Sequence, residues 1–147
     1  MPEILPFRGL RYSAEYTRPT VFAPPYDVIS PADREHFTAS DAYNITHIDV
    51  TPIPTPDDWY NTAAARLLAW RSQGVLTMDP APAYYGYLQQ FSLADGSQHS
   101  RKGVFAAVRL AEWGAGIYRH EHTRAAPRVD RLSLMRATRT QLSPVFG

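Results

Sequence analysis

The hydrophobic pattern of this chain changes its period at Gly74, and this change limits the folds open to it. Before Gly74, apolar residues recur every three or four positions, which is the spacing of one buried helix face. These residues are Trp59, Ala63, Leu67 and Trp70. After Gly74, residues 83–91 and 101–110 read as strands, joined by a hairpin-type turn at 94–97. Mixed periods of this kind predict an α/β (α+β) fold, a mixed sheet with flanking helices.

Local start signals place the remaining helices. Ser30 before Pro31 predicts a helix start, because serine caps and proline fits the first helical position. Residues 55–58 repeat this signal and open the helix that ends at Gly74. A last helix is expected from Pro127 to about Thr140. We expect short strands at 44–50 and 117–119 and the start of another strand at 143–146. In the strand 101–110, four apolar side chains should face the same way: Val104, Ala106, Val108 and Leu110.

Size and composition describe an ordinary globular chain. The 147 residues fit one domain, residues 1–147, and the net charge of +1 gives no general reason to expect nucleic acid as a partner. The absence of cysteine excludes disulfides and thiolate metal sites. No apolar run approaches the ~20 residues of a membrane helix, and the N-terminus lacks the regions of a signal peptide. We expect a cytoplasmic protein with no membrane contact.

Titratable side chains crowd together in the run His120, Glu121, His122 and Thr123. The two histidines lack the His-Glu-x-x-His spacing of a zinc helix, so a zinc site is not expected. An acid–base role remains open, because histidine titrates near neutrality and glutamate can act as a base or metal ligand. The structural alternative is that Glu121 pairs with a nearby arginine while Thr123 closes a turn.

Arginines dominate the last predicted helix. Arg128, Arg131, Arg136 and Arg139 fall within an arc of about 140° on a helical wheel. Leu132 and Met135 share that arc, so the pattern is no basic stripe for nucleic acid. Pairing with Asp130, or with a phosphate on a small ligand, explains these arginines better. Asp27, in a proline-stiffened turn, could coordinate magnesium or cap the helix after Ser30.

Seven ordered motifs resemble one family. They are PFRGLRY (6–12), PPYDVIS (24–30), WRSQGVL (70–76), RKGVF (101–105), HEHT (120–123), DRL (130–132) and SPVF (143–146). Their order and spacing resemble the N-terminal part of the large family of unknown function numbered one thousand and fifteen. The resemblance covers essentially the whole chain. That family is similar, more distantly, to the ParB and sulfiredoxin-like nucleotide-binding fold, a group that includes free-serine kinases.

The resemblance implies a nucleotide-dependent kinase that transfers phosphate to a hydroxyl, with Mg²⁺ and ATP or ADP as cofactors and a small molecule as substrate. Relatives grip the phosphates with an Asp-Gly-His-His-Arg type motif, which this chain lacks. We therefore expect the N-terminal part of a longer protein, with a sheet incomplete at its C-terminus and no activity alone. The alternative is a non-catalytic nucleotide-binding or protein-interaction module.

Site roles follow from this resemblance. Glu121 is expected to be the base or magnesium ligand, His120 a phosphate or substrate contact, and Arg131 a source of charge stabilisation. The further substrate- or phosphate-binding candidates are His122, Thr123, Asp130 and Arg8, and Asp27 is a possible magnesium ligand.

Overall fold

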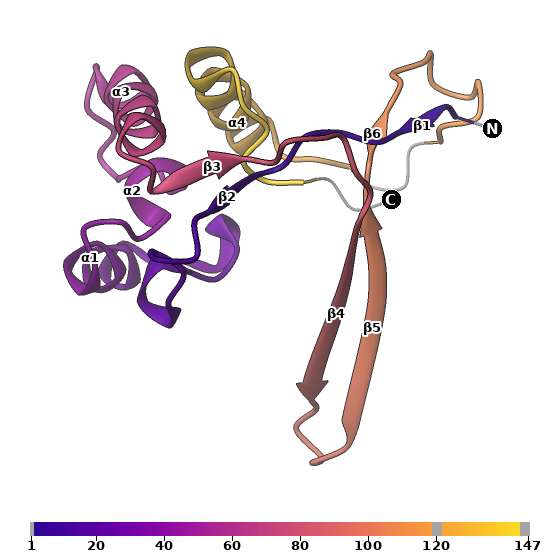
Figure 1. Cartoon of the computed structure of the whole chain (residues 1–147), viewed down its shortest axis with the longest axis horizontal. Helices are drawn as coiled ribbons and strands as arrows, with labels where there is room; N and C mark the ends of the chain where they lie inside the picture. The colour runs from indigo at the N-terminus through magenta and orange to yellow at the C-terminus, as the bar shows by residue number, and fades with distance from the viewer. Residues whose placement is uncertain (1, 119–121, 145–147) are drawn as a thin grey trace. The chain divides into compact units, whose positions relative to one another are not determined.

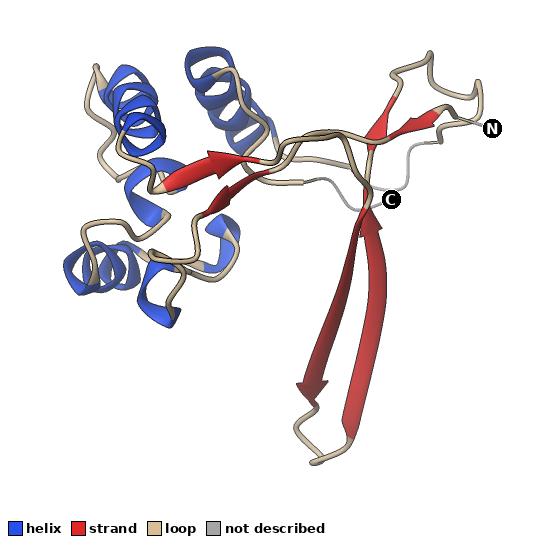
Figure 2. Ribbon diagram, viewed as in Figure 1, coloured by secondary structure: helices blue, strands red, loops and turns tan. Residues whose placement is uncertain are grey.

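The computed structural model describes residues 2–118 and 122–144. The chain forms two compact units, each made of two segments (Figure 1). Unit 1 comprises Met1–Leu10 and Met78–His122, and unit 2 comprises Arg11–Thr77 and Thr123–Gly147. Helices and small sheets are both present, so the expected α+β class is confirmed (Figure 2). A single domain over 1–147 stays a prediction.

Within the described residues, unit 2 carries four α-helices: α1 (Pro31–Ser40), α2 (Thr46–Asp49), α3 (Trp59–Ser72) and α4 (Ala125–Thr138). Two 3₁₀ helices, η1 (Pro19–Val21) and η2 (Tyr26–Val28), precede them. Helix α3 packs against α2 and α4, and α1 packs against α2. The strands β2 (Leu10–Tyr12) and β3 (Leu76–Met78) pair with each other as a two-stranded sheet.

The predicted helix signals are largely confirmed. Ser30 caps α1 in a capping box: its hydroxyl accepts from the Asp33 N–H at 3.2 Å, and the Asp33 carboxylate accepts from the Ser30 N–H at 3.1 Å. Helix α3 begins at Trp59, later than residues 55–58 suggested, and ends before Gly74, whose φ of 74° favours glycine. The predicted apolar face of α3 is buried: Trp59, Ala63, Leu67 and Trp70 are between 0% and 6% exposed.

One predicted strand is a helix. Residues 44–50 alternate between buried and half-buried positions, which resembles a strand, but residues 46–49 form α2. The Asn44 carbonyl side-chain oxygen accepts from the Thr46 N–H at 3.0 Å and from its hydroxyl at 2.7 Å. This local capping turns the backbone before a strand can form, so the strand prediction was wrong.

Unit 1 contains the other two sheets. Strands β4 (Tyr85–Ser92) and β5 (Gln98–Phe105) form an antiparallel hairpin, and β1 (Ile4–Leu5) pairs antiparallel with β6 (Ala107–Val108). The predicted turn is confirmed, with Gly96 at φ 84°. The predicted strand 101–110 is interrupted at Ala106, because the chain leaves β4 there and pairs with β1 instead. Val104, Val108 and Leu110 are exposed.

Two further strand predictions are not met within the described residues. Ile117 closes a tight turn, where its carbonyl accepts from the Gly114 N–H at 2.8 Å, and residue 119 lies outside the described residues. Ser143 and Pro144 form no strand, and residues 145 and 146 also lie outside the described part. No helix in the described residues is long and apolar enough to cross a membrane.

Candidate functional site

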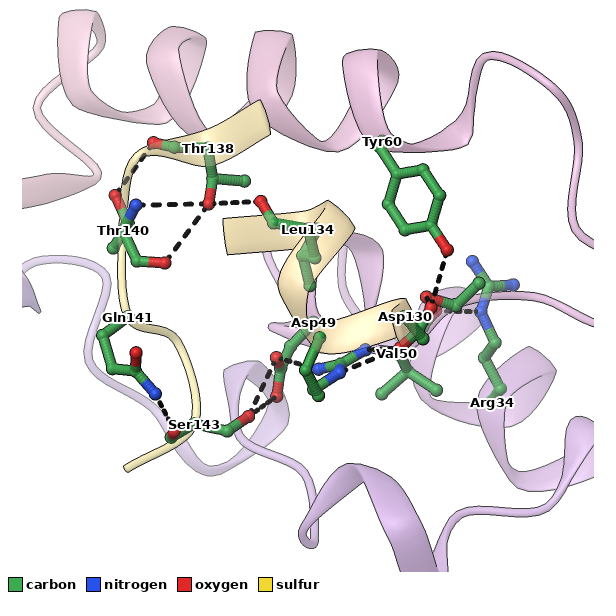
Figure 3. Close-up of polar contacts among 12 residues, drawn as sticks. Arg34, Asp49, Val50, Tyr60, Asp130, Leu134, Thr138, Thr140, Gln141 and Ser143 are labelled. Atoms are coloured by element: carbon green, nitrogen blue, oxygen red, sulfur yellow. Dashed lines mark hydrogen bonds and ion pairs between the residues drawn. The ribbon is translucent and has the colours of Figure 1, made fainter. Parts of the chain in front are cut away.

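Helices α2, α3 and α4 bring a cluster of polar side chains together in unit 2 (Figure 3). Asp130 on α4 accepts a hydrogen bond from the Tyr60 hydroxyl of α3 at 2.9 Å and from the Thr51 hydroxyl at 2.7 Å. The Thr51 hydroxyl also accepts from the Trp59 indole N–H at 3.1 Å. The carboxylate of Asp130 is therefore held by α3 and by the segment that follows α2.

Arg131 lies between two carboxylates. Its Nη1 donates to Asp49 at 2.8 Å, and its Nε and Nη2 donate to one oxygen of Asp130 at 2.9 and 2.7 Å. The ring of Tyr26 stacks on this guanidinium, with the central carbon 4.1 Å from the ring centroid. The Arg131 side chain is only 17% exposed. The two carboxylates and the Tyr26 ring hold the guanidinium in one orientation, and its positive charge is compensated within the cluster.

The two carboxylates differ in their electrostatics. Burial raises the pKa of Asp49, with Asp130 adding to the rise, while Arg131 and the Ser143 hydroxyl only partly oppose it. For Asp130, burial also acts upward, but the hydrogen bonds from Thr51, Arg131 and Tyr60 outweigh it and lower the pKa. Asp130 is thus the carboxylate held firmly in its charged form, and Asp49 is the one closer to taking up a proton.

The structure brings together only part of the predicted site. Asp130 and Arg131 are adjacent and bonded, and Asp27 lies exposed in η2, beside the Tyr26 that stacks on Arg131. Arg8 belongs to unit 1, where its Nε donates to the backbone carbonyl of Asp79 at 2.6 Å.

The rest of the predicted site falls in or beside the undescribed gap. His122 and Thr123 are exposed, and His120 and Glu121 lie outside the described residues. Among the residues that the structure describes, no group of three or more histidine, aspartate or glutamate side chains could hold a metal ion. The structure thus leaves the predicted roles of the histidine–glutamate run as predictions.

Sequence reasoning missed Asp49, Thr51 and Tyr60. Asp49 lies 82 residues from Arg131, and Tyr60 lies 70 residues from Asp130. No motif marks these residues, and the helix α2 that presents Asp49 was predicted to be a strand. The Asp130–Arg131 pair was the only sequence signal that pointed to this cluster.

A hollow of about 750 Å³ lies at the C-terminal end of α4, next to this cluster along the helix. Its lining includes Arg136, Arg139, Thr140 and Gln141. In contrast to Arg131, neither Arg136 nor Arg139 forms an ion pair with any described residue. Two positive charges therefore line a hollow without a counter-ion among the described residues.

Comparison with known proteins shows the family of this chain. A family model described as "Protein of unknown function (DUF1015)" matches residues 4–147. The chain belongs to this family. No curated protein and no solved structure matches it significantly.

In this DUF1015 chain, several motifs that suggested the family form identifiable parts of the fold. The segment 24–30 forms η2 and supplies the cap of α1 at Ser30. The segment 70–76 ends α3 and begins β3, with Gly74 between them. Asp130 and Arg131 are the motif residues at the polar cluster.

Proposed function

We propose that this chain is part of a nucleotide-dependent small-molecule kinase that transfers a phosphoryl group to a hydroxyl such as that of free serine. The proposal is supported by the distant resemblance of the DUF1015 family, to which the chain belongs, to the ParB and sulfiredoxin-like group that includes free-serine kinases. A cytoplasmic location, where nucleotides and free amino acids are both available, is part of it.

The hollow at the end of α4 is the observation that carries the proposal. Arg136 and Arg139 line it without ion-pair partners among the described residues, and Thr140 and Gln141 add polar groups. Guanidinium groups match phosphate oxygens in charge and in geometry. A phosphorylated ligand would supply the missing counter-charge, and we assign this hollow to the phosphate groups.

Arg131 and its partners have a different part in the proposal. The guanidinium is fixed by Asp49 and Asp130 and is stacked on Tyr26, so it would orient neighbouring groups and contribute positive charge near a transferring phosphoryl group. Glu121 remains the proposed base or magnesium ligand, and His120 the proposed phosphate or substrate contact. His122 and Thr123 remain proposed substrate- or phosphate-binding residues.

The described residues could hold Mg²⁺ only with few protein ligands, the rest being water or substrate phosphate. It usually keeps several waters and binds through one or two carboxylates together with substrate phosphates. Asp27 is exposed on η2, next in sequence to the Tyr26 whose ring stacks on Arg131, and its carboxylate is the one proposed to hold the ion. The metal would neutralise phosphate charge, while the side chains of this chain position the nucleotide and the acceptor hydroxyl.

A second candidate is a non-catalytic nucleotide-binding or protein-interaction module. The observation that favours it is the internal pairing of the polar cluster: Asp49, Asp130 and Arg131 bond mainly to one another and to neighbouring hydroxyls. A cluster of this kind can serve stability alone. The two candidates differ in whether a phosphorylated product forms.

The test is to incubate the intact protein with ATP or ADP and a panel of amino acids, and to look for a phosphorylated product. In parallel, Arg136→Gln with Arg139→Gln should weaken nucleotide binding by about tenfold or more, since a hydrogen bond to a charged group contributes roughly 1.5–3 kcal/mol. The matched control is Arg124→Gln with Arg128→Gln, at the other end of α4. Equal effects of both pairs on affinity would contradict a phosphate site at the hollow.

Glu121→Gln separates the catalytic and structural roles of that residue. Loss of a general base should reduce turnover by about 10²–10⁴-fold and leave the melting temperature unchanged. If Glu121 serves only an ion pair, the same variant should lose stability and keep its turnover. Full activity of a folded Glu121→Gln protein would end the catalytic assignment.

A further inference from the structure

The hairpin β4–β5 is a two-stranded sheet with eight residues in each strand. Within the described residues no third strand pairs with either of its edges, and Figure 1 shows it as an extended ribbon. Isolated two-stranded hairpins are marginally stable in water, and three or more strands with an apolar face are usually needed. The hairpin therefore presents two long edges that could accept another strand.

The register shows which groups point outward. Leu93 and Ser97 form a hydrogen-bonded pair at the turn, with the Leu93 N–H bonded to the Ser97 carbonyl at 3.0 Å. Because hydrogen-bonded and non-bonded pairs alternate in an antiparallel ladder, every second residue of β4 directs its backbone groups to the outer edge. These residues are Gly86, Leu88, Gln90 and Ser92, all of them exposed.

The two edges differ in charge. Strand β5 carries Arg101 and Lys102, and charged residues of this kind keep edge strands from pairing with copies of themselves. Strand β4 contains no charged residue and no proline along its eight residues. An acidic partner strand would be attracted to β5, whereas the neutral edge of β4 can pair with its own copy without like charges meeting.

The side chains on one face of the hairpin also favour pairing of β4 with a second copy of itself. Tyr85, Tyr87 and Phe91 share a face of β4, and the Tyr87 ring lies 5.2 Å from the Phe105 ring. The Tyr87 ring also covers Gly103, where any Cβ would collide with it. Pairing of two β4 strands would continue this aromatic face across four strands and place aromatic side chains of both copies in cross-strand contact.

We propose that β4 is a dimerisation edge, at which two copies of this chain pair antiparallel through a two-fold axis at Leu88, so that Gly86 of one copy lies opposite Gln90 of the other. The result is a continuous four-stranded sheet in the order β5–β4–β4–β5. The backbone groups of Gly86, Leu88 and Gln90 supply the hydrogen bonds between the copies. This inference is independent of the kinase proposal, because it uses only unit 1.

A pair of proline variants tests the assignment of the edge. Gln90 and Ser100 face each other in the hairpin, and each directs its N–H to the outer edge of its own strand. Gln90→Pro should give the monomer mass by light scattering, since proline removes the outward donor of β4. Ser100→Pro, the matched control, should leave the dimer intact. Circular dichroism of both variants confirms that they are folded.

A distance measurement keeps the proposal falsifiable if either proline variant unfolds. The chain has no cysteine, so Gln89→Cys and Asp95→Cys each give a single site for a spin label. Labels at Gln89 should lie close together near the two-fold axis. Labels at Asp95, in the turn beyond the end of β4, should lie much farther apart, because the four residues from Gln89 to Leu93 alone span about 13 Å on each side of the axis.

Three outcomes would overturn the proposal. The first is a monomeric wild-type protein from micromolar to millimolar concentration. The second is a dimer that Ser100→Pro disrupts and Gln90→Pro does not. The third is a dimer in which the Gln89 labels are farther apart than the Asp95 labels.

Discussion

At the scale of single residues, Asn44 shows how unit 2 satisfies a fully buried polar group. Its Nδ2 donates to the carbonyls of Thr20 at 2.7 Å and Phe22 at 3.0 Å. Its Oδ1 accepts two hydrogen bonds from Thr46. All four bonds of the amide are made, so its burial carries little desolvation penalty and fastens the segment after η1 to α2.

His47 is held in one neutral form by its neighbours. Its Nε2 lies 3.1 Å from the Thr38 carbonyl and 3.2 Å from the Asp41 carbonyl, so this nitrogen must carry the proton. Its Nδ1 then accepts from Arg66 at 3.1 Å. Burial lowers the pKa of His47, and the charge of Arg66 lowers it further.

We predict that unit 2 loses stability as the pH falls below about 6.5, the ordinary pKa of histidine. The folded state binds this proton less tightly than the unfolded state, so the contribution is complete above that pH and disappears below it. Urea unfolding between pH 7.5 and 5.5 measures the effect. His47→Gln should flatten this dependence, whereas His36→Gln, at an exposed position of α1, should not. An identical slope in all three proteins would contradict the prediction.

At the scale of secondary-structure elements, the buried face of α3 organises unit 2. Trp70 is 4% exposed and contacts the rings of Tyr12, Tyr43 and His47, with centroids 5.7–6.5 Å apart. The ring thus connects α3 with β2 and with the segment that leads into α2. The helix contributes to the fold mainly through this face, since tertiary packing provides most helix stability in proteins.

We predict that Trp70→Ala destabilises the protein by roughly 3–5 kcal/mol, because the cavity adds to the lost burial of the ring. Leu68→Ala is the matched control on the same helix: Leu68 is 65% exposed, and its removal should change stability by no more than about 0.5 kcal/mol. Denaturant unfolding measures both. Equal losses in the two variants would show that the α3 face is assigned incorrectly.

The C-terminal end of α4 stores backbone strain. Arg139 has φ 53° and ψ 30°, a left-handed conformation that disfavours residues with a Cβ, and its N–H donates to the Met135 carbonyl at 2.8 Å. Glycine is the usual residue at this position of a helix end. A ligand role of the Arg139 side chain is one that glycine could not fill.

We predict that Arg139→Gly raises stability by about 1 kcal/mol, since glycine adopts this conformation without a Cβ penalty. Arg136→Gly should have the opposite sign and lower stability by about 1 kcal/mol, because Arg136 lies inside the helix. Thermal unfolding gives the comparison. A melting temperature that falls in both variants would mean that the side chain of Arg139 stabilises the fold in another way.

At the scale of the whole molecule, the hydrophobic core lies in unit 2. The buried apolar residues are Val21, Ile48, Val50, Trp59, Ala63, Leu67, Trp70, Val75, Leu76 and Leu134. All belong to the segments of unit 2, while large apolar residues of unit 1, such as Leu88 and Val104, are exposed. Unit 2 therefore has more buried apolar surface than unit 1, and this burial makes local unfolding of unit 2 more costly.

We predict that backbone amides of α3 exchange with deuterium more than about tenfold more slowly than those of the β4–β5 hairpin in dilute protein. Mass spectrometry of peptides from the two regions measures this ratio. Protein diluted until it is monomeric is the appropriate sample, because the proposed dimer would protect the outer edge of β4. Equal protection of both regions would contradict a core confined to unit 2.

The sequence by itself determined the elements whose signals are local. Ser30 and Asp33 cap α1 from three residues apart, Gly74 ends α3, and Asp95 to Ser97 form the hairpin turn. The periodic burial of α3 was likewise visible, because one helix face repeats every three to four residues. Each of these features depends on backbone preferences within a few positions, so the residues themselves suffice to predict it.

Only the tertiary structure decided the polar cluster and the division of the chain. Asp49 and Tyr60 reach Arg131 and Asp130 from positions 82 and 70 residues away. Residues 44–50 have an alternating pattern, yet the fully bonded Asn44 makes a helical turn there. Likewise, β5 stops at Phe105, because the residues that follow it form β6, and β6 pairs with β1 from about a hundred residues earlier in the chain. Contacts between distant segments set these features, and no local preference of the residues encodes them.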